Sequence, residues 1–315
     1  MRTAYDLARC LLPDYRCKFS RHDFTLAQLF ACLVLREFFG VSFRKAEAIL
    51  RDSPELLGEA GLKTAPDHNT LWRAMNHIVR TRHSNRMLDV LTDLFARARL
   101  LGLGQKPLAI DSTCFELHHR SVHYDRRCRH MALQRHPRKP KKPGSWGKSV
   151  NAGRSRQTRA TPKLAIAVAA GCHLILAAKT RLGTGADCRD FDGLLYDAWR
   201  RAGVKTVVAD AGYDSEANHC IARQDLGVRS IISLGGGRPT SKLPTGRWRR
   251  HMAKRASRKT ERKLYGQRAQ SETAHSMIKR NLGSALRARK PENRKAEMMR
   301  VLTHNIMLLC DELEG

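Results

Sequence analysis

The first hundred positions carry apolar side chains at helical spacing. Between positions 26 and 34 these side chains fall on one stripe of a helix, and Thr25 and Gln28 have the spacing of a capping box at its start. In a capping box the two side chains satisfy backbone N–H groups that the first helical turn leaves free. Gly40 is placed to close the same helix. The pattern therefore predicts a helix that begins after Thr25 and ends just before Gly40.

Further helices are predicted in the same region. Ser42 caps one that stops before Pro54, residues 67–70 (Asp-His-Asn-Thr) cap the next, and a third runs from about 85 to 100. Short helices with tight turns suit a helix-turn-helix-like DNA-binding unit. A helical bundle without DNA contact fits the periodicity equally well, because apolar spacing does not say what a helix touches. We expect a small all-helical N-terminal domain over 1–104, with DNA binding as one of these two interpretations.

After Gly104 short apolar strands alternate with helices. Strands are predicted at 108–111, 164–169, 174–178, 206–210 and 230–234, and helices at 191–201, 215–226, 265–282 and 296–310. The second and third strands form a hairpin around Ala170 and Gly171. The order strand, hairpin, helix, strand, helix, strand, helix predicts an α/β fold, a mixed sheet with helices packed on it, over 105–315.

The charge of the chain narrows the choice of partner. There are 59 Lys and Arg residues against 29 Asp and Glu, a formal net charge of +30, while 42% hydrophobic residues are enough for a packed core. A field of this strength attracts polyanions, and nucleic acid is the leading candidate. A basic surface kept for solubility is the less favoured alternative. We therefore expect double-stranded DNA as the partner.

Two segments hold much of this charge. Residues 126–163 contain thirteen Lys or Arg and no acid, and residues 238–263 contain eleven and one acid. Neither can bury much apolar area, so we expect both to be basic insertions, either solvated linkers or arms that follow DNA, with DNA tracking favoured. Arg249 and Arg250 are candidate DNA contacts in the second. Trp146 and Trp248 lie in these arms, where an indole can stack on an unpaired base or pack on the domain surface. The other two tryptophans, Trp72 and Trp199, are expected in the core.

The chain shows no sign of export. Its first nineteen residues lack the uninterrupted apolar core of a signal peptide, and its longest apolar run, 164–178, is too short to cross a bilayer. Nine cysteines without a Cys-x-x-Cys pair fit free thiols in a reducing compartment. We expect a cytoplasmic, nucleoid-associated protein with no membrane partner.

Two carboxylates each follow an apolar strand directly. Asp111 ends the strand predicted at 108–111, and Asp210 ends the one at 206–210. On adjacent parallel strands the two side chains would lie side by side. Two-metal phosphoryl transfer needs carboxylates that converge on cations about 3.5–4 Å apart. Its third ligand must come from another element, and Glu272 is the candidate. Asp214 is a weaker one, since it lies in the turn past the strand.

Glu272 belongs to a polar pattern along one predicted helix. Tyr265, Arg268, Glu272 and Lys279 are spaced by three, four and seven, so at about 100° per residue they share one face. A face of this kind suits a surface that holds metal and phosphate together. For these four residues alone, an exposed helix side with incidental ion pairs is the better interpretation.

The four residues nevertheless resemble the Tyr-Arg-Glu-Lys signature of DDE transposases from bacterial insertion sequences, families four and five. Other motifs follow in the order of that group. These are Asp111-Ser-Thr for the first aspartate, Val208-Ala-Asp210-Ala-Gly-Tyr213-Asp214 for the second, and, in the N-terminal region, Gly40-Val-Ser-Phe-Arg, Arg51-Asp-Ser-Pro54 and Pro66-Asp-His-Asn-Thr70-Leu. The resemblance covers residues 25 to 310, and several motifs in order make chance a poor explanation.

The resemblance implies an RNase H-like fold and an insertion-sequence transposase. Asp111, Asp210 and Glu272 would hold two Mg²⁺ (or Mn²⁺) ions, and the enzyme would cut the ends of its element and join the freed 3′-hydroxyl to target DNA. Tyr265, Arg268 and Lys279 would contact or position the end DNA. A homodimer on DNA is expected from the reaction, because two DNA ends must be joined.

Two alternatives stay open at this point. In the first, a structural zinc ion binds the stretch rich in His and Cys that follows Asp111. Its spacing matches no standard zinc pattern, however, in Cys114, His118, His119, His123, Cys128, His130 and His136. The chain could also be a catalytically inactive or domesticated DNA-binding relative of a transposase. The intact set of three acids favours an active enzyme, because acids inside a positive field repel DNA unless metal neutralises them.

Overall fold

The structure is a computed structural model. It describes residues 1–79, 81–117, 127, 131, 134, 161–183, 185–235, 243–288 and 296–314. Trp146, most of the first basic segment and six of the seven His and Cys residues that follow Asp111 lie outside the described residues, Cys114 being the exception. The zinc alternative and a stacking role for Trp146 therefore stay untested.

The N-terminal region is helical, as predicted. Its helices are α1 (Arg2–Leu11), α2 (Leu26–Phe38), α3 (Phe43–Arg51), α4 (Pro54–Glu59), α5 (His68–Ile78) and α6 (Thr81–Arg97). The capping box at Thr25 and Gln28 is present, with both hydrogen bonds formed. Ser42 and Asp67 accept backbone N–H groups at the starts of α3 and α5. These local signals are short-range, which is why the sequence alone locates them.

A five-stranded mixed sheet follows, in the order β4-β3-β1-β5-β6. The strands are β1 (Leu108–Cys114), β3 (Pro162–Ala169), β4 (Ile175–Leu182), β5 (Thr206–Ala209) and β6 (Arg229–Ile232). β3 runs antiparallel to both β1 and β4, whereas β1, β5 and β6 are parallel. The predicted hairpin is confirmed. β1 continues past its predicted end at Asp111 because residues 111–114 pair with β3.

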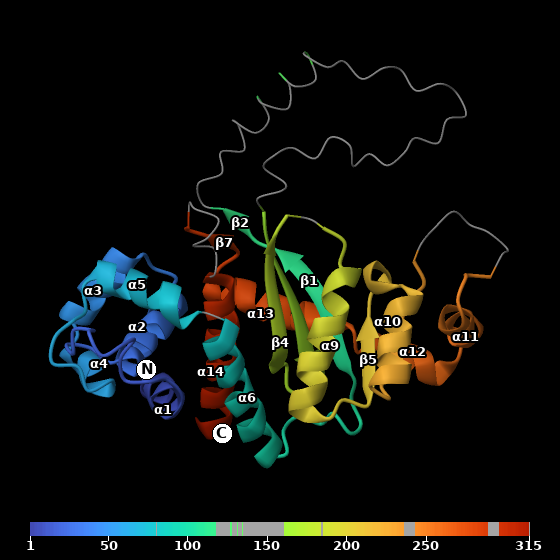
Figure 1. Cartoon of the computed structure of the whole chain (residues 1–315), viewed down its shortest axis with the longest axis horizontal. Helices are drawn as coiled ribbons and strands as arrows, with labels where there is room; N and C mark the ends of the chain where they lie inside the picture. Colours follow the sequence, from blue (N-terminus) through green and yellow to red (C-terminus); the bar gives the residue numbers. More distant parts are fainter. Residues whose placement is uncertain are drawn as a thin grey trace.

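Helices cover both faces of the sheet (Figure 1). Alternate residues of β3 point to opposite sides: Ile166 and Val168 join the core that includes α13 and α14, while Ala165 and Ala167 join the core under α9. The helices are α9 (Cys188–Ala202), α10 (Glu216–Cys220) with a π-helical turn at Ile221–Asp225, α11 (Arg247–Arg255), α12 (Lys259–Gly266), α13 (Ala269–Leu282) and α14 (Ala296–Glu314). A two-stranded ribbon joins β2 (Glu116–Leu117) to β7 (Ala285–Leu286).

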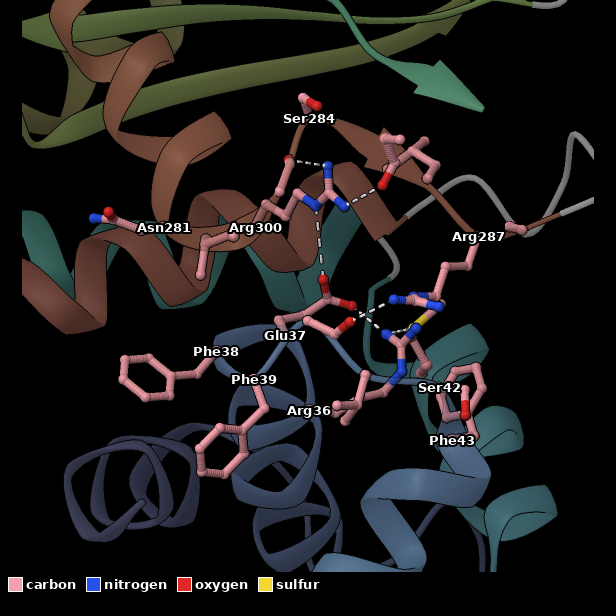
Figure 2. A pocket seen from close by; sticks show the side chains of 18 of the residues that line it. Arg36, Glu37, Phe38, Phe39, Ser42, Phe43, Asn281, Ser284, Arg287 and Arg300 are labelled. Carbon is pink, nitrogen blue, oxygen red and sulfur yellow. Dashed lines mark hydrogen bonds and ion pairs between the residues drawn. The ribbon is translucent and has the colours of Figure 1, made fainter. Parts of the chain in front are cut away.

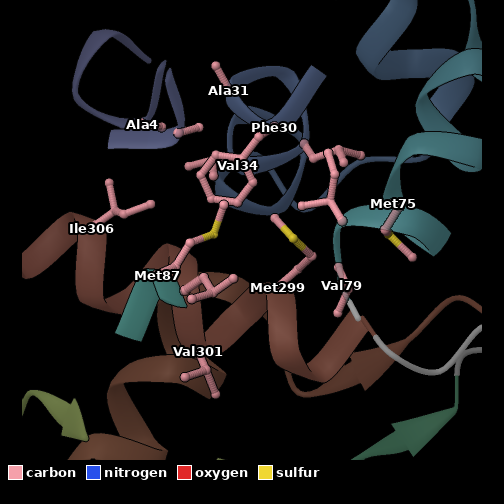
Figure 3. Packing of buried hydrophobic residues seen from close by; sticks show 14 of the residues in the cluster. Ala4, Phe30, Ala31, Val34, Met75, Val79, Met87, Met299, Val301 and Ile306 are labelled. Carbon is pink, nitrogen blue, oxygen red and sulfur yellow. The ribbon is translucent and has the colours of Figure 1, made fainter. Parts of the chain in front are cut away.

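The N-terminal helices share a hydrophobic core with the C-terminal ones. Phe30 and Val34 of α2 belong to the same buried cluster as Met87 of α6 and Met299 and Ile306 of α14 (Figure 3). α14 is the last helix in sequence, yet it lies between the N-terminal helices and the sheet (Figure 1). The beginning and the end of the chain are thus packed together.

Several expectations were wrong. The predicted helix 265–282 is two helices, because 3₁₀-type hydrogen bonds tighten the chain at residues 267–271 and separate α12 from α13. The second basic segment is not an irregular arm over 247–263, where it forms α11 and most of α12. Trp72 and Trp199 are not core residues: 42% and 37% of their surfaces are exposed, since each lies on the outward side of its helix.

Candidate functional site

The parallel pairing of β1 with β5 brings the two predicted aspartates together. Ile110 pairs with Ala209, and the next residue on each strand is Asp111 or Asp210. The cores of both strands are buried, so their positions are rigid. The register therefore places Asp111 and Asp210 at neighbouring positions on adjacent parallel strands, where β5 ends.

The pKa of Asp111 is shifted by burial and by the charged groups around it. Burial raises the pKa of Asp111 to about 6, the N–H of Ser112 acts against this rise, and the negative charge of Asp210 adds to it. Arg268 lowers the pKa and Glu272 raises it. All three predicted catalytic acids therefore interact, together with an arginine of the four-residue polar pattern.

Asp210 also begins a tight turn, the 3₁₀ helix Ala211–Tyr213. Its carboxylate accepts the N–H of Gly212 at 2.9 Å. A Cβ at Gly212 would lie 3.1 Å from Asp210 Oδ1 and 3.4 Å from Asp187 Oδ2, which is tighter than ordinary contact. A side chain at position 212 would therefore crowd both carboxylates, and the same contacts place a fourth acid beside the site.

That fourth acid, Asp187, escaped the sequence analysis. It precedes α9, accepts a hydrogen bond from Ser112 Oγ at 2.6 Å and forms an ion pair with Lys163 Nζ. Arg181 lies 3.6 Å from the same carboxylate. These two cations neutralise Asp187, so we assign it the task of holding the Asp111–Ser112 segment. Only a contact between residues 75 positions apart identifies it, and no local motif shows it.

Glu272 lies in the first turn of α13, which packs against β1. Its carboxylate is 2.7 Å from Arg268, and 55% of its side chain is exposed. Lys279, two turns further on, donates to Thr113 Oγ1 at 2.6 Å. Arg268, Glu272 and Lys279 are therefore gathered beside β1. Tyr265 is on α12 instead, where it packs against a small buried cluster of β1, β5 and β6.

The donor set fits hard divalent cations, which prefer carboxylate oxygens. Asp111 and Asp210 are neighbours on adjacent strands. Burial and the repulsion from Asp210 and Glu272 raise the pKa of Asp111, and a cation would stabilise its charged form. Among the residues that the structure describes, no three His, Cys, Asp or Glu side chains stand close enough to hold a metal ion together. In this conformation Glu272 is paired with Arg268.

The basic helix α11 is fixed to the loop that follows Asp210. Arg249 donates two hydrogen bonds to Asp214, at 2.9 and 2.7 Å, and the Asp214 side chain is only 1% exposed. Glu216 accepts the backbone N–H groups of Trp248 and Arg249 at the start of α11. Both acids thus tie α11 to the catalytic sheet, and Asp214 has a structural partner.

The three DNA contacts predicted on α11 have different surroundings. Arg249 is engaged with Asp214, as described. Arg250 is exposed and donates to the Pro244 carbonyl at 3.0 Å. Trp248 is half-buried, with the guanidinium groups of Arg223 and Arg247 4.9 and 5.0 Å from its ring centroid. Of the three side chains, Arg250 is therefore the most accessible to DNA.

Comparison with protein families decides the identity of this arrangement. A family model described as "Transposase DDE domain" matches residues 102–306, well over half of the chain. The chain belongs to the DDE transposase family. A second family model, "Transposase domain (DUF772)", matches residues 3–77. Comparisons with curated proteins and with solved structures found no match.

Membership of this family establishes the function in outline. The chain is an insertion-sequence transposase with an RNase H-like fold, a DNA-binding enzyme that uses divalent metal ions to cut and transfer DNA strands. The predicted fold and function are confirmed. Among the described helices of the transposase, none alone is long and apolar enough to span a membrane, and α2 with α3 reaches that length only across a 109° bend.

Proposed function

We propose that Asp111, Asp210 and Glu272 are the three acids that hold two Mg²⁺ or Mn²⁺ ions in this transposase. The observation that carries the proposal is the parallel register of β1 and β5, which places Asp111 beside Asp210, with Glu272 close enough to raise the pKa of Asp111. When bound, such a metal pair activates the attacking oxygen and stabilises the leaving oxygen of a phosphoryl transfer.

Arg268 gives this site a way to respond to DNA. In the absence of DNA its guanidinium neutralises Glu272 at 2.7 Å. A phosphate of the bound strand offers the same guanidinium a second anionic partner, since arginine binds carboxylates and phosphates alike. We infer that Arg268 moves from Glu272 to the phosphate, and that Glu272 then turns toward the two aspartates.

Other side chains would hold the DNA around this point. We assign Tyr265 and Lys279 to the end DNA beside Arg268, and Arg250 with Arg249 and Trp248 to the DNA that passes α11. The exposed position of Arg250 supports a phosphate contact. Arg249 keeps its place through Asp214 and contributes by holding α11 near the catalytic edge.

We further infer two functional units, a DNA-binding helical unit over 1–104 and a catalytic unit over 105–315 with basic insertions at 126–163 and 238–263. Joining two element ends requires two active sites, so we propose a homodimer on DNA. The free cysteines among the described residues suit a reducing compartment, and we place the reaction at the nucleoid.

The test is cleavage of a labelled duplex that carries the element's own terminal repeat. Wild-type protein with Mg²⁺ or Mn²⁺ should nick the duplex at the repeat boundary, and chelation of the metal should stop this. Asp210→Asn should bind the duplex without cutting it. Tight binding by the wild type with no cleavage in either metal would contradict the proposal and favour an inactive DNA-binding relative.

A further inference from the structure

A cavity apart from the catalytic acids lies where the N-terminal helices meet the end of α13 (Figure 2). It has a volume of about 720 Å³, within the range of sites that take small ligands. Its walls come from the end of α2, the start of α3, α5, and the chain from Asn281 to Ala288. The cavity is thus formed by segments more than 200 residues apart in sequence.

Aromatic rings are left exposed at this cavity. Phe38, Phe39 and Trp72 all line it, with 52%, 47% and 42% of their surfaces exposed. The rings of Phe38 and Phe39 meet edge to face, with centroids 5.5 Å apart. Single exposed apolar residues are common on protein surfaces, but three large rings around one hollow indicate a binding site. Rings of this kind stack on planar ligands.

The cavity is also positively charged. Arg36, Arg287 and Arg300 line it against one acid, Glu37. Glu37 is buried and paired with both Arg36 and Arg300, which anchors the wall of the cavity (Figure 2). Arg287 donates to the Gly40 carbonyl at 2.9 Å. Glu37 is matched by buried arginines, so the net positive charge of the lining favours a negatively charged ligand, such as a nucleotide phosphate.

A second, smaller hollow lies along α13 between Glu272 and this cavity. This hollow of about 380 Å³ runs along α13 past Glu272, Ser276 and Arg280 to Asn281, and Asn281 also lines the aromatic cavity. Glu272 and Asn281 are nine positions apart on the helix, which is roughly 13 Å at 1.5 Å per residue. That length corresponds to about four steps of stacked bases. A strand that follows α13 from Glu272 would therefore reach the cavity after about four nucleotides.

We propose that the aromatic cavity binds the base of an unpaired nucleotide, in the strand whose phosphate lies at Glu272. The rings of Phe38, Phe39 and Trp72 stack on the base, and the arginines attract its phosphate. This inference rests on the proposed position of the cleaved phosphate. The cavity then holds the DNA end open, and it links the N-terminal helices to the catalytic site.

The experiment measures binding of two duplexes in EDTA, one blunt and one with a four-nucleotide single-stranded extension that ends in 2-aminopurine. Stacking in the cavity should quench the 2-aminopurine fluorescence. Trp72→Leu and Phe39→Leu should lose the quenching and bind the extended duplex about tenfold more weakly. Both variants should bind the blunt duplex within about twofold of the wild type. Trp72→Phe keeps a ring and should restore the quenching.

The matched control is Tyr196→Leu, which removes another exposed ring, on α9, and should change nothing. Undiminished quenching in Trp72→Leu, or equal weakening on both duplexes, would overturn the proposal. So would a wild-type dimer that Phe39→Leu converts to monomers, because a second copy would then occupy the cavity. The readout needs no metal, so a failure of the proposed catalytic function would appear in the cleavage assay and leave this one unchanged.

Discussion

Two pairs of acids near the end of β5 have opposite surroundings. Asp214 accepts two hydrogen bonds from Arg249 and one from the N–H of Gly235, and Glu216 accepts two backbone N–H groups of α11. At the catalytic edge, Asp210 accepts the N–H of Gly212 and Asp111 the N–H of Ser112. The first pair is matched by donors of the protein, whereas the second pair faces other acids.

The pKa values follow this difference. Burial acts to raise the pKa of Asp214, but the hydrogen bonds from Arg249 and Gly235 and the charge of Arg249 hold it below its usual value. The pKa of Asp111 instead rises to about 6, because burial is joined by repulsion from Asp210 and Glu272. Asp214 and Glu216, which fasten the structure, are therefore satisfied within the protein, whereas Asp111 and Asp210 keep free lone pairs for a cation.

The largest effect on strand cleavage is expected from Asp111 and Asp210. Asp111→Asn and Asp210→Asn should each reduce strand cleavage by about 10³-fold or more, because a lost metal ligand removes several kcal/mol of transition-state stabilisation. Asp111→Asn should also raise the free energy of unfolding by about 1 kcal/mol, since it removes a buried carboxylate that Asp210 and Glu272 also repel. Single-turnover cleavage and urea denaturation measure the two quantities. A loss of stability together with activity would assign these residues a structural task.

The opposite result is expected for the fastening acids. Asp214→Asn leaves the Arg249 guanidinium without its anion and should lower the free energy of unfolding by about 1.5–3 kcal/mol. Urea denaturation measures this loss, and metal affinity should stay within about twofold of the wild type. Loss of metal binding in a variant that remains folded would show that Asp214 belongs to the metal site.

Acidification should change the stability contributed by the buried histidines and by Asp111 in opposite directions. Burial lowers the pKa of His219 and His304 to about 4, so between pH 6.5 and 4 the unfolded chain binds more protons at these sites than the folded one. Stability should fall with decreasing pH, by at most about 1.4 kcal/mol per pH unit for each histidine. Asp111 opposes this trend, because its raised pKa makes the folded state take up a proton.

Two variants check that balance by urea denaturation between pH 6.5 and 5. His304→Gln should make the slope of stability against pH shallower, and Asp111→Asn should make it steeper. An unchanged slope in Asp111→Asn would contradict the raised pKa of this carboxyl.

The smallest expected effect is at Glu216, which caps α11 through two backbone N–H groups. Glu216→Gln keeps one acceptor oxygen and removes the charge, so we expect a loss of about 1 kcal/mol in stability. Thermal unfolding measures it, with Glu55→Gln as the control, because Glu55 is an exposed acid in the first turn of a helix, α4. A loss equal to that of the control would mean that the cap contributes nothing.

Local patterns in the sequence predicted much of this fold. The capping box at Thr25, the two strands before Asp111 and Asp210, and the order of elements depend on neighbouring residues, and all are confirmed. The break between α12 and α13 was not predicted, because the polar pattern runs through it without interruption. The anchoring of Tyr265 against the sheet and of α11 by Asp214 depends on contacts between distant residues.

In the candidate site too, features set by neighbouring residues could be predicted, and features set by distant contacts could not. Adjacent parallel strands could be inferred for Asp111 and Asp210, but the role of Asp187 depends on Ser112 and Lys163, which are distant in sequence. The aromatic cavity is formed by α2, α5 and the end of α13. Because these segments are distant in sequence, no local pattern predicted it. Trp72 looked like a core residue because its helix is amphipathic, and only the packed structure shows which side it occupies.

The central claim is that Asp111 and Asp210, which keep free lone pairs, hold metal together with Glu272 once Arg268 releases it, whereas Asp214, matched by Arg249, does not. Electron paramagnetic resonance of Mn²⁺ titrated into the transposase bound to its terminal-repeat duplex tests this directly. The account predicts two bound ions in the wild type and in Asp214→Asn, and loss of binding in Asp111→Asn, Asp210→Asn and Glu272→Gln. Full Mn²⁺ binding in Asp210→Asn, or its loss in folded Asp214→Asn, would contradict the account.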